Sequence, residues 1–248
     1  MPQPRSQVVV MIPTYNEREN IGGLVRDILS LPIAHDLTVL VVDDNSPDGT
    51  AAEVMASGAS DSRVRLLLRK EKRGRGSAGA AGFKEALRLG ADLIVEMDGD
   101  GSHQPAFIPA LLNAARRSDM AIGSRFVKGG QDSDRPAHRR LVTFLVRHFV
   151  RRLFSLPVRD VSSGFRCFRR EVLEKIGLEA LVSTGPSVVL EILHRAHRLG
   201  FSIEEVPIVF IDRKKGKTKL TGRTLAGTLL MAIRIRWMRR PLKPLSPT

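Results

Sequence analysis

The chain has 248 residues, which is enough for one or two domains with an ordinary hydrophobic core. Hydrophobic residues make up 42% and charged residues 27%, a globular composition that excludes a disordered or low-complexity chain. The one cysteine, Cys167, excludes an intramolecular disulfide framework and a zinc site built on several cysteines. So little cysteine fits a reducing, cytosolic compartment.

Positive charge is concentrated in the second half of the chain. Residues 1–124 carry 14 Lys and Arg against 16 Asp and Glu, whereas residues 125–248 carry 26 against 10. A strongly basic half indicates an anionic partner, which leaves nucleic acid, a phosphorylated substrate or an anionic membrane surface as candidates. Aromatic residues make up only 5% and do not alternate with basic ones, which argues against nucleic acid.

In the first half, apolar runs alternate with helical patterns. The spacing predicts strands over residues 8–12, 37–42, 64–68, 93–97 and 120–123, and helices over 20–31, 82–90 and 105–117. This alternation predicts an α/β fold with a mostly parallel sheet and helices on both faces. Ligands of such sheets bind at the carboxyl ends of the strands, where the polar clusters of this sequence fall.

The second half contains two long amphipathic patterns, over residues 136–155 and 222–240, with a helix over 186–199 and a strand over 206–211 between them. Each pattern has an apolar face and a face rich in arginine. Such a helix either lies in a lipid headgroup layer or packs its apolar face on the core. No apolar run approaches the roughly 20 residues of a spanning helix, so we expect none. We place a catalytic domain at 1–220, with an interface helix at 135–156, and a C-terminal helix and Pro-rich tail at 221–248.

Two carboxylates, Asp98 and Asp100, stand one residue apart where the fourth predicted strand ends. Both can reach one divalent cation, and hard oxygen ligands suit Mg²⁺ or Mn²⁺. The alternative is a solvated turn, because Asp-Gly is a common turn pair. For the nearby His103, helix capping or packing is a better interpretation than metal binding.

Two further clusters suit a nucleotide. Asp44 ends the second strand, where a carboxylate can accept a hydrogen bond from a base or a ribose, although turn chemistry also explains acids in this position. Tyr15, the one tyrosine of the chain, follows the first strand and can stack on a base. Its neighbour Glu17 also suits the start of a helix.

The segment Gly74–Gly79 has glycines spaced as in a dinucleotide-binding loop, but it does not open the first strand–helix unit. Close packing of a helix on the sheet explains its small residues better.

Seven segments, taken in order, carry a family resemblance: Pro13–Glu17, Val41–Thr50, Met97–Pro105, Gly123–Phe126, Ser163–Arg166, Glu205–Ile208 and Gly216–Leu220. Together they resemble family 2 glycosyltransferases of the GT-A fold, and within them the branch that mannosylates dolichol or polyprenol phosphate. The resemblance runs from about Val8 to Leu220. Arg75 departs from it, because an apolar residue is usual at that position.

The resemblance implies GDP-mannose as donor, a polyprenyl phosphate as acceptor, and work at the cytosolic face of a membrane, either as a peripheral protein or with a membrane-anchoring partner. It also implies roles for individual residues. Pro13, Tyr15, Glu17 and Asp44 would hold the nucleotide; Asp98 and Asp100 would hold Mg²⁺ or Mn²⁺; Arg125 and Arg139 would hold the acceptor phosphate; Arg213 and Lys219 would close over the donor or the acceptor.

The chemistry of this reaction agrees with the residues present. A phosphate monoester is already anionic at neutral pH, so it needs no general base to attack. What the reaction needs is neutralisation of the departing diphosphate and positioning of the attacking phosphate. In-line displacement inverts the anomeric centre, so an α-linked donor gives a β-linked product. A donor such as UDP-glucose or UDP-N-acetylglucosamine stays open as the alternative.

Overall fold

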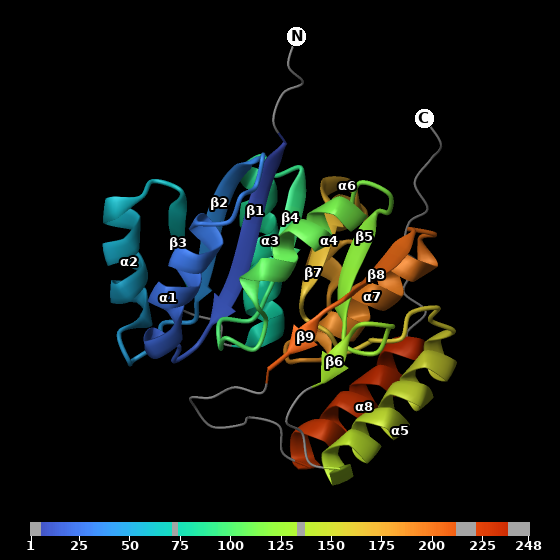
Figure 1. The fold of residues 1–248 in the computed structure, drawn as a ribbon. Coiled ribbons are helices and arrows are strands. Elements are labelled where there is room, and N and C mark those ends of the chain that lie inside the picture. Colours follow the sequence, from blue (N-terminus) through green and yellow to red (C-terminus); the bar gives the residue numbers. More distant parts are fainter. Residues whose placement is uncertain (1–5, 71–73, 133–136, 212–221, 238–248) are drawn as a thin grey trace.

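The computed structural model describes residues 6–70, 74–132, 137–211 and 222–237, and it contains a seven-stranded sheet (Figure 1). Its strands follow the order β3-β2-β1-β4-β7-β5-β8. They span Gln7–Thr14 (β1), Asp36–Asp43 (β2), Val64–Leu68 (β3), Leu93–Glu96 (β4), Met120–Ser124 (β5), Arg166–Arg169 (β7) and Ile203–Pro207 (β8). A second, two-stranded sheet pairs β6 (Gln131–Asp132) with β9 (Val209–Phe210).

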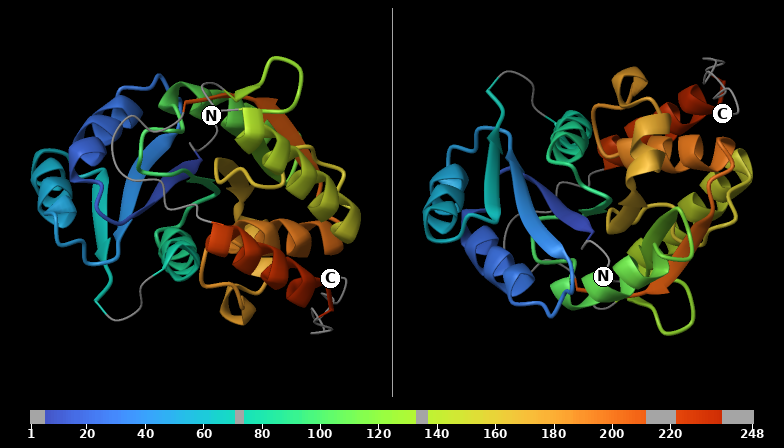
Figure 2. Two further views of the ribbon diagram at one scale, coloured as in Figure 1. Left: turned by 90° about the horizontal axis from the view of Figure 1, so that it is seen from below. Right: turned by 90° about the horizontal axis from the view of Figure 1, so that it is seen from above.

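Helices cover both faces of the large sheet (Figure 2). The helices α1, α2 and α4 contribute to the core on one face, and α3 and α5–α8 to the core on the other. They span Arg18–Leu29 (α1), Thr50–Ser60 (α2), Arg75–Arg88 (α3), Ile108–Ala114 (α4), Ala137–Phe154 (α5), Arg170–Lys175 (α6), Val188–Arg198 (α7) and Gly222–Trp237 (α8), with short 3₁₀ turns at Pro105–Phe107 and Leu178–Ala180.

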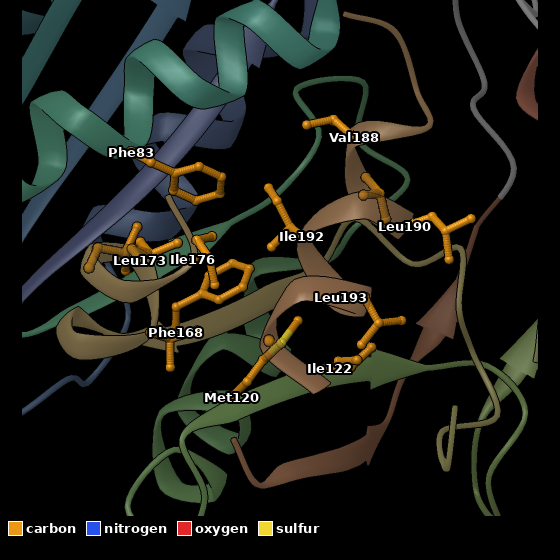
Figure 3. Packing of buried hydrophobic residues seen from close by; sticks show 14 of the residues in the cluster. Phe83, Met120, Ile122, Phe168, Leu173, Ile176, Val188, Leu190, Ile192 and Leu193 are labelled. Atoms are coloured by element: carbon orange, nitrogen blue, oxygen red, sulfur yellow. The ribbon is translucent and has the colours of Figure 1, made fainter. Parts of the chain in front are cut away.

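Alternation along β1 explains how one strand serves two cores. Val9 and Met11 point to the face of α3, whereas Val8, Val10 and Ile12 point to the face of α1. All five are fully buried, as expected for a central parallel strand. In the core shown in Figure 3, the rings of Phe83 and Phe168 meet edge to face, with centroids 5.3 Å apart.

The predicted mostly parallel sheet is confirmed, and the differences are local. Strand β7 runs antiparallel between β4 and β5. The predicted strand over 206–211 divides into β8 and β9. Helix α3 begins at Arg75 instead of residue 82, so most of the Gly-rich segment is helical. Within the segment, Ala78 is buried in the core on this face of the sheet, which agrees with the predicted packing of a helix on the sheet. A Cβ on Gly76 would lie 2.4 Å from the carbonyl oxygen of Ser183, so Gly76 packs closely against a loop and not against the sheet.

The long helices α5 and α8 lie side by side at one end of the molecule (Figure 1). Packing of the apolar faces on the core is confirmed in part, whereas contact with a lipid headgroup layer stays a prediction. Val150 and Phe154 of α5 and Ala232 and Ile235 of α8 are buried in the core. Other large apolar side chains remain exposed, namely Val142, Phe144, Leu145, Phe149, Leu230, Ile233 and Trp237.

Within the described ranges, no helix has the length and apolar character needed to cross a membrane. The proposed boundary at residue 220 lies outside the described residues. The described part of α8 shares one hydrophobic core with α3, α6 and α7.

Candidate active site

The loops after β1 and β2 are joined into one platform at the carboxyl edge of the sheet. The Thr14 hydroxyl donates to Asp43 Oδ1 at 3.0 Å, and the Ser46 hydroxyl donates to the same oxygen at 2.6 Å. The backbone N–H of Asn16 donates to Ser46 Oγ at 2.9 Å. Asp43 is fully buried, so its carboxylate serves the structure of this platform.

Asp48 fixes the starts of two helices against this platform. It accepts hydrogen bonds from the backbone N–H of Arg18 at 3.0 Å and of Thr50 at 2.9 Å. The Thr50 hydroxyl accepts from the backbone N–H of Glu17 at 3.0 Å. The predicted nucleotide residues Pro13, Tyr15 and Glu17 are half-buried; Pro13 lies near the end of β1, and Tyr15 and Glu17 follow on a loop whose backbone is held in place.

Asp44 already has protein partners. It is 4% exposed, forms an ion pair with Arg69, and accepts the backbone N–H of Gly74 at 2.7 Å. Arg69 also donates to Ser77 Oγ at 3.0 Å. These contacts link the platform to the start of α3. The role of Asp44 in nucleotide binding stays a prediction.

The two carboxylates after β4 differ in accessibility. The Asp98 side chain is 34% exposed, whereas Asp100 is 9% exposed and accepts from the backbone N–H of Ser102 at 3.0 Å and from its hydroxyl at 2.6 Å. We call residues Asp98–Ser102 the acidic turn. One accessible carboxylate and one fixed carboxylate suit a ligand that binds from solvent.

His103 packs below the acidic turn. Its ring stacks on Phe165 with centroids 5.0 Å apart and meets Phe210 edge to face at 5.8 Å. Its Nδ1 lies 3.0 Å from the backbone nitrogen of Asp98, whose N–H it accepts. Burial lowers the pKa of His103, so the ring is neutral with its proton on Nε2. The packing role expected for it is confirmed.

Arg125 and Asp160 form a buried ion pair near this turn. Asp160 accepts from Arg125 Nε at 2.8 Å and from Nη2 at 2.9 Å. Burial raises the pKa of Asp160, but the Arg125 charge and the hydrogen bonds from Arg125 and Ser162 together outweigh burial and hold that pKa below its usual value. Arg125 Nη2 also donates to Ser162 Oγ at 2.7 Å, and its guanidinium lies 5.1 Å from the centre of the Phe210 ring.

This pair gives Arg125 a structural task that the sequence did not reveal. Two of its nitrogens are engaged, and only 8% of the residue is exposed. Its Nη1 lies 4.0 Å from Asp132 Oδ1. Contact with an acceptor phosphate stays a prediction for Arg125. The side chain of a further predicted residue, Arg139 on α5, is not described, and the predicted residues Arg213 and Lys219 lie outside the described residues.

Sequence reasoning also missed two charged residues at the acidic turn. Arg75, the first residue of α3, contacts Asp98 with Nη2 at 2.7 Å. The buried Glu96, two residues before Asp98, contacts Arg75 Nη1 at 3.1 Å. A charged residue at the last position of a buried strand was the available signal for Glu96. Nothing local indicated the contacts of Arg75, because its partners lie more than 20 residues away.

The acidic turn fits a divalent cation that takes further ligands from a bound molecule. Asp98 and Asp100 supply hard carboxylate oxygens, and Asp98 is open to solvent. Within the described part of the chain, no group of three or more His, Cys, Asp or Glu side chains is arranged to hold a metal. A magnesium-like ion held by two carboxylates usually completes its shell with phosphate oxygens and water.

A mostly parallel sheet flanked by helices, with an acidic turn after its fourth strand, places the chain in the GT-A fold class. Solved structures share this fold. One is glucosyl-3-phosphoglycerate synthase from Mycobacterium tuberculosis in complex with Mn²⁺, UDP and glucosyl-3-phosphoglycerate. The two structures superimpose with a TM-score of 0.66 at 19% sequence identity, over 93% of this chain and 78% of that chain. A second complex of that synthase, with Mn²⁺, UDP and phosphoglyceric acid, gives a TM-score of 0.68 at 22% identity, covering 92% of this chain and 78% of that one.

Sequence comparison then gives the family. The model of glycosyl transferase family 2 matches residues 9–177, and the chain belongs to this family. It is 41% identical over 219 residues to the undecaprenyl-phosphate mannosyltransferase of Micrococcus luteus, covering 87% of this chain and 88% of that protein. It is 42% identical over 223 residues to the polyprenol monophosphomannose synthase of Mycolicibacterium smegmatis, covering 89% and 83%. The dolichol-phosphate mannosyltransferase of Pyrococcus furiosus is 37% identical, covering 88% of this chain and 60% of that protein. The family resemblance read from the seven segments is confirmed.

Proposed function

We propose that this glycosyltransferase moves mannose from GDP-mannose to a polyprenyl phosphate and releases GDP. The observation that carries the proposal is the match, over more than four fifths of both chains, to two relatives named for mannosyl transfer to undecaprenyl or polyprenol phosphate. The acidic turn and the basic second half of the chain supply the charges that this transfer needs.

The donor end of the reaction belongs to the acidic turn and the platform. Asp98 and Asp100 would hold Mg²⁺ or Mn²⁺ against the diphosphate, and the ion would neutralise charge on the departing nucleotide. The platform that carries Tyr15 and Glu17 would hold the nucleoside, because its backbone is fixed by Asp43 and Asp48. Fixed contacts lower the ordering cost of binding.

The acceptor end belongs to the arginines. We assign Arg125, placed by Asp160 beside Phe210, to positioning the attacking phosphate, together with Arg139. Arg213 and Lys219 would close over the phosphates. The phosphate monoester needs no general base, so the protein's role is to align the reacting groups and to supply compensating positive charge. In-line attack gives a β-linked mannosyl lipid.

The face formed by α5 and α8 would rest on an anionic membrane that holds the lipid acceptor. Leu145 is 57%, Leu230 is 68% and Trp237 is 78% exposed on these neighbouring helices, and arginines such as Arg152 and Arg236 are exposed on them too. A helix that shows apolar and basic side chains together suits a headgroup layer. This arrangement supports peripheral contact with a membrane. The cytosolic face, with or without a membrane-anchoring partner, is part of the same proposal.

A donor panel tests the reaction. The protein is incubated with a short polyprenyl phosphate, Mg²⁺ and labelled GDP-mannose, UDP-glucose or UDP-N-acetylglucosamine in parallel, with EDTA as the metal control. We expect a lipid-linked product from GDP-mannose alone, with a β linkage by NMR, and none with EDTA. A lipid-linked product from a UDP-sugar would show that the proposed donor is wrong and that the proposed acceptor is right. An α-linked product would contradict in-line displacement.

A further inference from the structure

A resident positive charge, the Arg75 guanidinium, already occupies the acidic turn. Its Nη2 and Nε lie 2.7 and 3.3 Å from Asp98 Oδ1, and its Nη1 lies 3.1 Å from Glu96 Oε1. One side chain thus bridges a buried carboxylate and the accessible carboxylate that we assign to the metal. Only 23% of the Arg75 side chain is exposed.

The backbone around Arg75 forms a slot for this guanidinium. Its neighbours hold the start of α3 in place, because Gly74 N–H donates to Asp44 at 2.7 Å and Gly76 N–H donates to the Thr184 carbonyl at 2.9 Å. Opposite lies Gly164, where a Cβ would stand 2.5 Å from Arg75 Nη2. A side chain at that position would require the guanidinium to shift from its place beside Asp98.

The two carboxylate partners of Arg75 are not equivalent. Glu96 is 1% exposed, and its Oε2 has no hydrogen-bond partner among the described residues. Asp98 is partly open to solvent. Glu96 therefore anchors Arg75 in the protein, whereas Asp98 is the partner that can turn to another cation.

We propose that Arg75 is a positioning residue that competes with the divalent cation for Asp98 and so makes metal binding depend on the nucleoside diphosphate. This inference rests on the proposed metal role of Asp98 and Asp100. Without nucleotide, the metal ion must compete with the Arg75 guanidinium for Asp98. Once bound, the metal ion is repelled by the guanidinium nearby. A bound diphosphate adds negative charge that balances both cations, so metal and nucleotide strengthen each other's binding.

The test measures Mn²⁺ binding instead of turnover. Free Mn²⁺ is followed by electron paramagnetic resonance during titration of the wild type and of Arg75→Leu, without nucleotide and with saturating GDP or UDP. We expect Arg75→Leu to bind Mn²⁺ alone about tenfold more tightly than the wild type and to gain less affinity from the nucleotide. Equal or weaker binding of Mn²⁺ alone by Arg75→Leu would overturn the proposal.

Arg88→Leu is the matched control. Arg88 lies on the same helix, carries the same charge and pairs with Glu85 at 2.7 Å on the surface. We expect the Mn²⁺ affinity of Arg88→Leu to equal that of the wild type. If Arg88→Leu and Arg75→Leu gain the same Mn²⁺ affinity, the gain comes from the change in net charge, and the proposal is refuted. If Arg75→Leu fails to fold because Glu96 loses its partner, the double variant Arg75→Leu/Glu96→Gln must give the same tighter binding.

Failure of the proposed function gives a different pattern. If the wild type and Arg75→Leu both fail to bind Mn²⁺ with either nucleotide, the metal role of Asp98 and Asp100 is wrong, and the inference falls with it. If UDP strengthens Mn²⁺ binding and GDP does not, only the proposed donor base is wrong. The competition by Arg75 is then decided by comparing the Mn²⁺ affinities of the wild type and Arg75→Leu without nucleotide.

Discussion

The acidic turn and the face of α5 and α8 both carry charged side chains, but the charges are paired with protein groups at the acidic turn and exposed on the helical face. At the acidic turn, the carboxylates are held by arginine, serine and backbone partners; Asp100 is buried and Asp98 is partly exposed. On the helical face, arginines such as Arg152 and Arg236 are exposed beside exposed Leu145 and Trp237. The first arrangement fixes the positions of a few groups through direct contacts, as the binding of an ion or a phosphate requires. The second offers a broad surface with little geometric demand, as a membrane does.

The largest effect is expected at the acidic turn. Asp100→Asn keeps an acceptor for Ser102 but removes one charge that we assign to the metal. We expect transfer to fall at least about 100-fold, the scale of losing one electrostatic contact to a transition state. The measurement is initial rate together with metal-dependent binding of GDP. Asp92→Asn, an exposed carboxylate before the amino end of β4, is the matched control and should keep full activity. Full activity of Asp100→Asn would remove the metal assignment.

The Arg125–Asp160 pair separates a structural role from an acceptor role. Arg125→Gln leaves the buried Asp160 carboxylate without its cation, so we expect a loss of about 3–5 kcal/mol in the free energy of unfolding. The double variant Arg125→Gln/Asp160→Asn removes both charges and should recover most of that stability. If Arg125 positions the acceptor, the double variant still shows an acceptor KM raised about 10-fold or more, with GDP affinity unchanged.

Kinetics and thermal denaturation of the same preparations decide between the two roles of Arg125. A double variant that regains both stability and acceptor KM would make the residue purely structural.

Substitutions on the exposed face of α5 and α8 should weaken binding to membranes without changing the rate of mannosyl transfer. Leu145→Glu/Leu230→Glu replaces two side chains that are 57% and 68% exposed, so folding should be unaffected. We expect partition onto vesicles with about one third anionic lipid to fall roughly tenfold or more, since apolar contact is lost and acidic charge is added. Transfer to a detergent-dispersed short acceptor should persist. Met55→Glu/Leu68→Glu, at exposed apolar positions elsewhere, is the control. Equal loss in the control would contradict a specific membrane face.

The smallest effect concerns the support beneath α5. His194 of α7 lies against Phe154 with ring centroids 4.5 Å apart, and burial lowers its pKa to about 4. The unfolded chain binds this proton near pH 6.5 and the folded chain does not, so His194 destabilises the fold as pH falls from about 6.5 to about 4. We expect the wild type to lose up to about 1.4 kcal/mol per pH unit more than His194→Gln in this window. Denaturant unfolding at several pH values measures the difference. Parallel pH profiles would contradict the assignment.

Sequence alone located the sheet and the edge that carries the site. Strand and helix periodicity are local signals, and the carboxyl ends of parallel strands meet at one edge whatever the details of packing. The strand at residues 64–68 was predicted to the residue. Asp98 and Asp100 were predicted as metal ligands for the same reason, because two acids after a buried strand can be recognised in the sequence alone; that role stays a prediction. β7 was not found, because Cys167 and Phe168 between two arginines are too short a pattern to show a strand.

The partners of the charged groups were decided by the tertiary structure. Arg125 meets Asp160 across 35 positions, Arg69 meets Asp44 across 25, and Arg75 meets Asp98 across 23. No periodicity encodes such pairs, because each depends on how two separate loops are brought to the same edge of the sheet. The same holds for the helical faces, where the pattern showed which side of α5 is apolar. Only packing against α8 and the core decided that Val150 is buried and Leu145 exposed.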